Sequence, residues 1–122
     1  MGAIVKKFED FKIWQEAMIL IKEIYSCTSK LKDYSFNDQI QRATVSVMNN
    51  IAEGYESGSN IMFKKFLQIA NGSCGEVRSM LYIAIDLKYF DEDKANGSIK
   101  DCKCLASAIK HLVGYLNQYR KN

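Results

Sequence analysis

The chain has 122 residues, of which 48% are hydrophobic and 25% are charged, and its net charge is +3. This length and composition predict one domain, over residues 1–122, with a real core, and they exclude an intrinsically disordered chain. No apolar run is long enough to span a bilayer, and the short apolar stretch before Lys6 and Lys7 has the wrong order for a signal peptide. We therefore expect a cytoplasmic protein without membrane contact.

The first predicted helix covers about residues 10–31, and Asp10 is a candidate for its N-cap. Its apolar residues follow helical spacing and make one stripe: Ile13, Ala17, Leu20 and Ile24. The polar link that follows contains Asn37 and Asp38, either of which is a candidate N-cap for the second helix.

The second predicted helix covers about residues 38–57 and carries another apolar line: Ile40, Thr44, Val47 and Ile51. Gly58 suits the left-handed conformation that often follows the end of a helix. Asn60 is the candidate N-cap of the third helix, which is predicted over about residues 61–90.

The fourth helix is predicted over about residues 92–120, after Asp91. Gly97 weakens its first turns, so its regular part is expected to begin nearer Ser98. The chain has no proline, although average usage gives about six in this length, and that absence also favours helices. Four helices with short links predict an all-α, up-down-up-down antiparallel four-helix bundle. The second and third helices are apolar over more than one face, which predicts self-association.

The four cysteines are Cys27, Cys74, Cys102 and Cys104. They form no Cys-x-x-Cys pair and have no nearby pair of histidines, so a zinc site is not expected. We expect reduced thiols, no metal and no cofactor.

The string NNIAEG, residues 49–54, places polar groups in a stretch that otherwise resembles helix core. Helical spacing puts Asn50 and Glu53 on one face with Arg42 and Ser46. If the second and third helices form a hairpin, that face meets residues of the third helix. The predicted polar network consists of Arg42, Ser46, Asn50, Glu53, Ser73 and Glu76.

Within this network, the hairpin register predicts that Ser46 lies opposite Ser73 and that Arg42 and Glu76 meet as a buried ion pair. Gly72 and Gly75 are expected to let the two helices approach closely.

One interpretation of the network is an acid/base site, with Glu53 or Glu76 as the base. The other is a structural network that sets the register of two helices. We favour the structural interpretation, because His111, the one histidine, has no serine or cysteine partner at a recognisable spacing. No catalytic residue is therefore assigned.

Three stretches carry a resemblance to a known family: FEDFKIWQEAM, RATVSVMNNIAEGYES and FKKFLQIANGSCGEVRSMLYIA. They resemble the bacterial four-helix-bundle proteins encoded in intervening sequences of 23S ribosomal RNA genes. The resemblance implies a helical protomer that assembles as a homopentamer and has no enzymatic activity. That family is similar in fold to the accessory variability proteins of diversity-generating retroelements, which are pentameric, bind nucleic acid and partner a reverse transcriptase.

The sequence departs from the family pattern in the turn after Gly54. Relatives often carry basic residues there, whereas this chain has Tyr55, Glu56 and Ser57. This difference argues against a nucleic-acid contact through that turn.

Positive charge is concentrated instead in residues 94–122, which hold six basic residues and one acidic residue. On a helical projection, four lysines form a stripe opposite the apolar face: Lys100, Lys103, Lys110 and Lys121. Such a stripe predicts sequence-tolerant, salt-sensitive contacts with the phosphates of RNA or DNA. A solvated lysine face is the alternative for the stripe. For the whole protein, the alternative is a protein-interaction scaffold or accessory subunit that binds a protein partner and no nucleic acid.

Overall fold

The computed structural model describes residues 7–118. They form a short 3-10 helix and four long α-helices: η1 (Phe8–Asp10), α1 (Lys12–Thr28), α2 (Tyr34–Glu56), α3 (Asn60–Asp86) and α4 (Glu92–Leu116). No strand occurs in this part of the chain. The prediction of an all-helical fold with four helices is confirmed.

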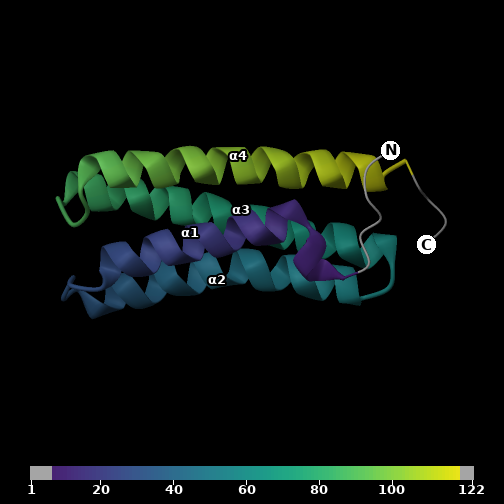
Figure 1. Ribbon diagram of the computed structural model, residues 1–122, viewed down its shortest axis with the longest axis horizontal. Helices are drawn as coiled ribbons and strands as arrows, with labels where there is room; N and C mark the ends of the chain where they lie inside the picture. The colour runs from purple at the N-terminus through teal and green to yellow at the C-terminus, as the bar shows by residue number, and fades with distance from the viewer. Residues whose placement is uncertain (1–6, 119–122) are drawn as a thin grey trace.

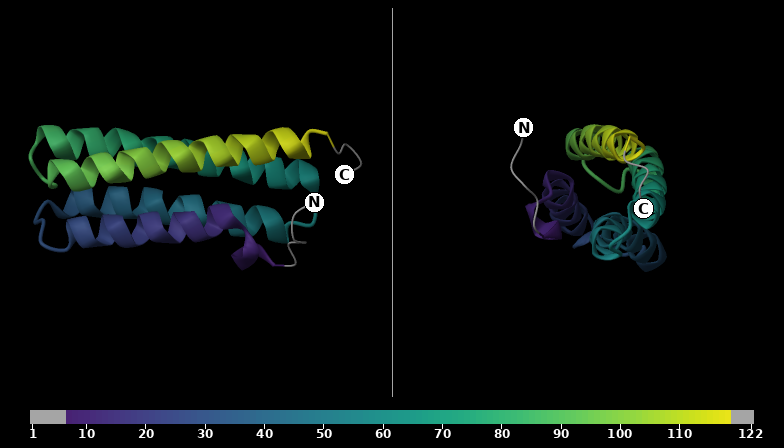
Figure 2. Two further views of the ribbon diagram at one scale, coloured as in Figure 1. Left: turned by 45° about the horizontal axis from the view of Figure 1, so that its top comes forward. Right: turned by 90° about the vertical axis from the view of Figure 1, so that its right-hand side faces the viewer.

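The four helices lie side by side along the long axis of the molecule (Figure 1). α1 packs against α2 and α4, and α3 packs against the same two helices (Figure 2). The α1–α2 and α3–α4 links lie at one end of the molecule and the α2–α3 link lies at the other (Figure 1). None of the helices within residues 7–118 combines the length and the apolar character needed to cross a membrane.

The two apolar stripes predicted for the first half of the chain form part of the core, and buried residues of α3 and α4 complete it. On α1, the side chains of Ile13, Ala17, Leu20 and Ile24 are buried. On α2, the exposed fraction is 0% for each of Ile40, Thr44, Val47 and Ile51. Thr44 fits this apolar line because its hydroxyl donates to the carbonyl oxygen of Ile40 at 2.6 Å, which leaves no unsatisfied donor.

The start of α2 differs from the prediction. α2 begins at Tyr34, because Asp33 is its N-cap and accepts a hydrogen bond from the N–H of Phe36 at 3.1 Å. The hydroxyl of Tyr89 also donates to Asp33 at 2.7 Å, which ties the α1–α2 link to the α3–α4 link. The hydrogen bond from Tyr89 and then that from Phe36 lower the pKa of Asp33. Asn37 is no cap; it is buried, and its amide donates to the carbonyl oxygen of Leu31 at 2.7 Å.

The N-caps of α1 and α3 also differ from the prediction. Asp10 lies in η1, and the N-cap of α1 is Phe11, which makes no side-chain capping bond. The N-cap of α3 is Ser59, whose hydroxyl oxygen accepts from the N–H of Met62 at 3.3 Å. Asp91 caps α4, as its place before the fourth helix suggested, but the regular helix already begins at Glu92 and continues through Gly97.

The end of α3 is set by an unusual backbone conformation rather than by glycine. Lys88 has a φ of 60°, in the left-handed region. The N–H of Lys88 donates to the carbonyl oxygen of Ile85 at 3.0 Å, and the N–H of Tyr89 donates to that of Ala84 at 2.8 Å. This pair of bonds is a Schellman motif, so α3 ends at Asp86 and not near residue 90. After α2, Gly58 takes the predicted left-handed conformation, with a φ of 75°.

The close approach of α2 and α3 is at Gly54 and not at Gly72 and Gly75, where we expected it. A Cβ atom at Gly54 would lie 2.8 Å from the Cβ of Phe66 and 2.9 Å from Cδ1 of Phe63. At Gly72 and Gly75, nothing lies within 4 Å of the position that a Cβ would occupy. The glycine of the NNIAEG string is therefore the one that lets the two helices meet.

Candidate functional site

Three residues of the predicted polar network are joined by hydrogen bonds. Ser46 on α2 and Ser73 on α3 lie opposite each other, with 2.9 Å between their hydroxyl oxygens. The amide of Asn50 donates to the hydroxyl oxygen of Ser46 at 3.0 Å and to its carbonyl oxygen at 2.8 Å. These bonds are half-buried and connect the α2 face to α3 at the predicted register.

The predicted ion pair between Arg42 and Glu76 does not form. The Nε of Arg42 instead donates to Asp38 at 2.9 Å, one turn earlier on the same helix, and the exposed fractions of these two side chains are 80% and 65%. Glu76 is exposed and accepts from the amide of Gln39 at 3.5 Å. Arg42 lies on the outside of the hairpin, where a pair with Asp38 needs no desolvation.

Glu53 and Arg42 line a hollow of about 470 Å³ together with Ser46, Asn50 and Tyr25. The hollow lies beside the hydrogen-bonded serines, so most of the predicted network borders one surface. Glu53 is exposed there. The hollow holds no histidine, cysteine or lysine that a carboxylate could activate as a nucleophile.

Replacing Ser73 with alanine is expected to lower the free energy of unfolding by about 1 kcal/mol, because Ser46 then loses a half-buried partner. A double-mutant cycle with Ser46→Ala should give a coupling energy of about 0.5–1 kcal/mol, measured by urea denaturation. The control is Ser79→Ala, an exposed serine on α3. A coupling energy near zero would contradict a register role for the two serines.

The predicted lysine stripe is divided between two surfaces. Lys103 and Lys110 line a groove of about 420 Å³ between α3 and α4, whereas Lys100 lines a hollow between α1 and α4. All three lysines are exposed. Lys121 lies outside the described residues.

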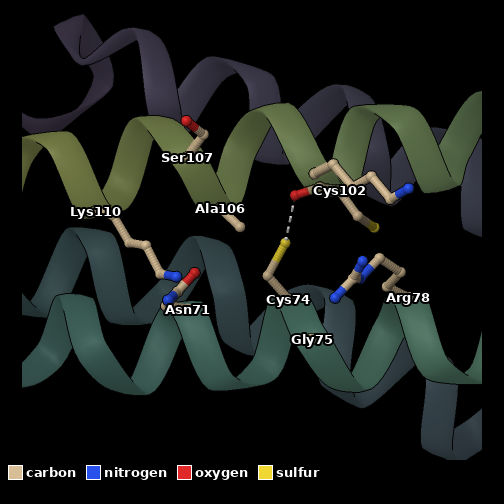
Figure 3. A pocket seen from close by; sticks show the side chains of 9 residues that line it. Asn71, Cys74, Gly75, Arg78, Cys102, Ala106, Ser107 and Lys110 are labelled. Carbon is tan, nitrogen blue, oxygen red and sulfur yellow. Dashed lines mark hydrogen bonds between the residues drawn. The ribbon is translucent and has the colours of Figure 1, made fainter.

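The α3/α4 groove, lined by Arg78, Lys103, Lys110, Ser107 and Asn71 among others, has no carboxylate in its lining. Figure 3 shows Arg78 projecting from α3 on one side and Lys110 reaching from α4 toward Asn71 farther along. Oδ1 of Asn71 is buried and has no hydrogen-bond partner among the described residues. Between residues 7 and 118 the one ion pair joins Arg42 and Asp38, so the groove cations have no acidic partner there.

Two cysteines lie at the bottom of the α3/α4 groove. The thiol of Cys74 donates to the carbonyl oxygen of Cys102 at 3.2 Å, and both side chains are buried (Figure 3). The neighbouring Cys74 thiol, and then burial, raise the pKa of the Cys102 thiol, which therefore stays protonated. All four cysteines are free.

The hollow around Lys100 has a different electrostatic character, because it also contains Glu23 and Asp101. The hydroxyl of Ser98 donates to Glu23 at 2.9 Å. Burial, and then the hydrogen bond with Asp101, raise the pKa of Glu23. A hollow that holds two carboxylates is a poorer place for a phosphate than the α3/α4 groove. Lys100 is thus separated from Lys103 and Lys110 in surroundings as well as in position.

Arg78 is the groove residue that sequence reasoning missed. Its signal is a seven-residue spacing: Lys64, Asn71 and Arg78 follow one another on α3 at the same interval as Lys103 and Lys110 on α4. Recognising that the α3 row and the α4 row line one groove requires the register of α3 against α4. From the sequence, a register is predicted for α2 and α3 alone, and Arg78 is therefore not included.

No group of three or more histidine, cysteine, aspartate or glutamate side chains is placed to hold a metal ion in the part of the chain that the structure describes.

Comparison with known proteins gives a family and a fold. A solved structure from Bacteroides thetaiotaomicron, a protein of unknown function from the S23 ribosomal protein family, matches with a TM-score of 0.77 and 19% sequence identity. The match covers 83% of this chain and 97% of that one, and at this identity it shows a shared fold. No curated protein matches the chain significantly. The family model for the 23S rRNA-intervening sequence protein matches residues 9–111. The chain therefore belongs to the family of 23S rRNA-intervening sequence proteins.

Proposed function

We propose that this protein is a non-enzymatic, up-down-up-down antiparallel four-helix bundle that assembles as a homopentamer and binds RNA or DNA through phosphate contacts from α4. The alternation of the links between the two ends of the molecule supports the antiparallel order (Figure 1). The family resemblance supports the pentamer, and so does an apolar surface on α3.

The apolar surface, which we name the α3 apolar edge, consists of Met62, Ile69, Ile83 and Leu87. The first three lie on α3 and Leu87 is its C-cap; their exposed fractions are 39%, 52%, 44% and 53%. Their spacing along the helix places them on one face, on which Ser73 and Glu76 separate Met62 and Ile69 from Ile83 and Leu87. An exposed apolar row of this kind is typical of a surface that another protein covers, and a second copy of the chain is the occupant we propose.

The observation that carries the nucleic-acid proposal is the pair of lysines in the α3/α4 groove. Lys103 and Lys110 are exposed, and neither forms an ion pair with a described residue. Solvated cations of one sign attract the phosphates of a nucleic acid and release its counterions on binding. In a pentamer the same surface is present five times, so weak contacts add up through multivalency.

The test is the affinity for fluorescein-labelled oligouridylate and oligothymidylate, measured by fluorescence anisotropy over a salt titration. Changing Lys103, Lys110 and Lys121 together to glutamate is expected to lower the affinity about a hundredfold or more at low salt. The matched control reverses three exposed lysines of α1 and the following link: Lys12, Lys30 and Lys32.

The control variant has the same net charge as the variant of Lys103, Lys110 and Lys121, so it separates local contacts from the electrostatic field of the whole protein. Circular dichroism of both variants verifies that the helices form. An equal loss of affinity in both variants, or no loss in either, would overturn the assignment of the surface. Co-purification with a protein while neither oligonucleotide binds would favour the scaffold function instead.

A further inference from the structure

We propose that the α3/α4 groove is a phosphate-binding site in which Arg78 of α3 and Lys103 of α4 hold one phosphate group of a polynucleotide between them. This inference rests on the proposed function and deepens it, because it names the residues and the chemical group recognised. It adds a residue of α3 to a surface that was expected on α4 alone.

The register of the two helices places Arg78 opposite Lys103. The ammonium of Lys64 on α3 donates to the side-chain oxygen of Asn117, the C-cap of α4, at 2.9 Å. These two residues therefore lie at the same height along the bundle. Arg78 lies two seven-residue steps after Lys64 on α3, and Lys103 lies two such steps before Asn117 on α4. Because the chain reverses at the α3–α4 link, Arg78 and Lys103 come to the same level, on the same side of their helices.

Arg78 and Lys103 are both exposed cations that line the α3/α4 groove. No carboxylate lines the groove, and neither cation has an acidic partner among residues 7–118. An anion bound between Arg78 and Lys103 would be attracted by both charges. A guanidinium presents two parallel N–H donors that match two phosphate oxygens, and the lysine adds a point charge.

The groove also offers space and a further donor for a chain of phosphates. Nothing lies within 4 Å of the position that a Cβ would take at Gly75, so α3 leaves the groove open at this level. Ser107 carries a hydroxyl on α4 between the levels of Lys103 and Lys110. We propose that a nucleic-acid strand bound at Arg78 and Lys103 continues along the groove toward Lys110, which extends from α4 toward Asn71, whereas Ser107 projects from the side of α4 away from α3 (Figure 3).

The site does not compete with the proposed assembly surface. Ile83 is five residues after Arg78, which rotates it by about 140° around the helix axis. The α3 apolar edge therefore lies well away from the groove that faces α4, and both surfaces of one chain can be occupied together.

The experiment uses the full-length protein with Arg78→Gln, and Arg42→Gln as the matched control. Both variants remove one exposed arginine charge, but Arg42 is paired with Asp38 and lies outside the groove. Affinity for labelled oligouridylate and oligothymidylate is measured by anisotropy at several salt concentrations. Arg78→Gln is expected to lower the affinity about tenfold and to reduce the slope of log affinity against log salt by about 0.7, the value for one phosphate of a single strand. Arg42→Gln is expected to leave both quantities unchanged.

A second arm separates an isolated phosphate from a polynucleotide. The Nε–H signal of Arg78 is followed by NMR while inorganic phosphate or unlabelled oligonucleotide is added, with sodium chloride at matched ionic strength as the reference. A shift with the oligonucleotide alone indicates recognition of a strand, and a shift with both probes indicates recognition of the phosphate group itself; either result supports the site. No shift with either probe overturns it.

The outcomes also separate this inference from the proposed function. If Arg78→Gln behaves like Arg42→Gln while the reversal of Lys103, Lys110 and Lys121 still removes binding, the groove site is wrong and the proposed function stands. If the native protein binds neither oligonucleotide, both proposals fail.

Discussion

Replacing Gly54 with alanine is expected to lower the free energy of unfolding by about 2 kcal/mol. The new methyl group would lie 2.8 Å from the Cβ of Phe66 and 2.9 Å from Cδ1 of Phe63, closer than folded proteins allow. The Cβ of Phe66 is attached to the backbone, so it cannot rotate away. The ring of Phe63 is held edge-on between Phe11 and Tyr55, with centroid distances of 5.8 and 6.1 Å. The helices must therefore separate, at a cost of about 1–3 kcal/mol that outweighs the better helix propensity of alanine.

The control for this variant is Gly97→Ala on α4. A methyl group there meets nothing within 4 Å, so only the propensity gain remains and stability should rise by about 0.5–1 kcal/mol. Both variants are compared with the native protein by urea denaturation at one protein concentration, because the proposed assembly would make stability concentration-dependent. A Gly54→Ala variant as stable as Gly97→Ala would show that α2 and α3 do not meet at this point.

Changing Ile69 and Ile83 together to glutamate is expected to convert the proposed homopentamer to single chains. Both side chains belong to the α3 apolar edge, with exposed fractions of 52% and 44% in the single chain. A carboxylate buried at an interface without a partner costs several kcal/mol, and the variant places two on every copy. Light scattering should give five times the chain mass of 13.9 kDa for the native protein and 13.9 kDa for the variant.

Ile19→Glu is the matched control for assembly, because Ile19 is the same residue type, is 55% exposed and lies on α1. This variant is expected to keep the mass of the native protein. A native protein that already has the mass of one chain would refute the pentamer. Dissociation by Ile19→Glu alone would place the assembly surface on α1 and not on the α3 apolar edge.

The buried stripes of α1 and α2 could be predicted from the sequence because helical periodicity alone decides which side chains share a face. The opposition of Ser46 and Ser73 follows from the same periodicity once α2 and α3 are folded about Gly58. For Arg42, periodicity predicted the wrong partner. Asp38 competes for it one turn away, and an exposed pair avoids the cost of burial.

The helix ends could not be predicted in the same way, because they depend on contacts between distant parts of the chain. Asp33 was missed as the N-cap of α2, and it is held partly by Tyr89, from the other half of the molecule. The end of α3 requires Lys88 in a left-handed conformation that glycine usually takes. A lysine at this position therefore does not predict the end of the helix.

For the candidate interface, Lys103 and Lys110 were found from the stripe on the fourth helix. Arg78 could not be found that way, because it belongs to another helix and joins the lysines only through the α3–α4 pairing. Lys100 shares their stripe, yet it lies beside Glu23 and Asp101 in the folded chain. A helical projection describes one helix at a time, and a groove needs two.

The measurement that tests the central claim most directly is the affinity of the native protein for single-stranded RNA and DNA as salt is raised from about 50 to 200 mM. The proposed backbone contacts from Lys103 and Lys110, repeated in the proposed assembly, predict binding at low salt, little preference between base sequences, and a steep linear fall of log affinity with log salt. Absence of binding at low salt, or an affinity that does not change with salt, would contradict the claim.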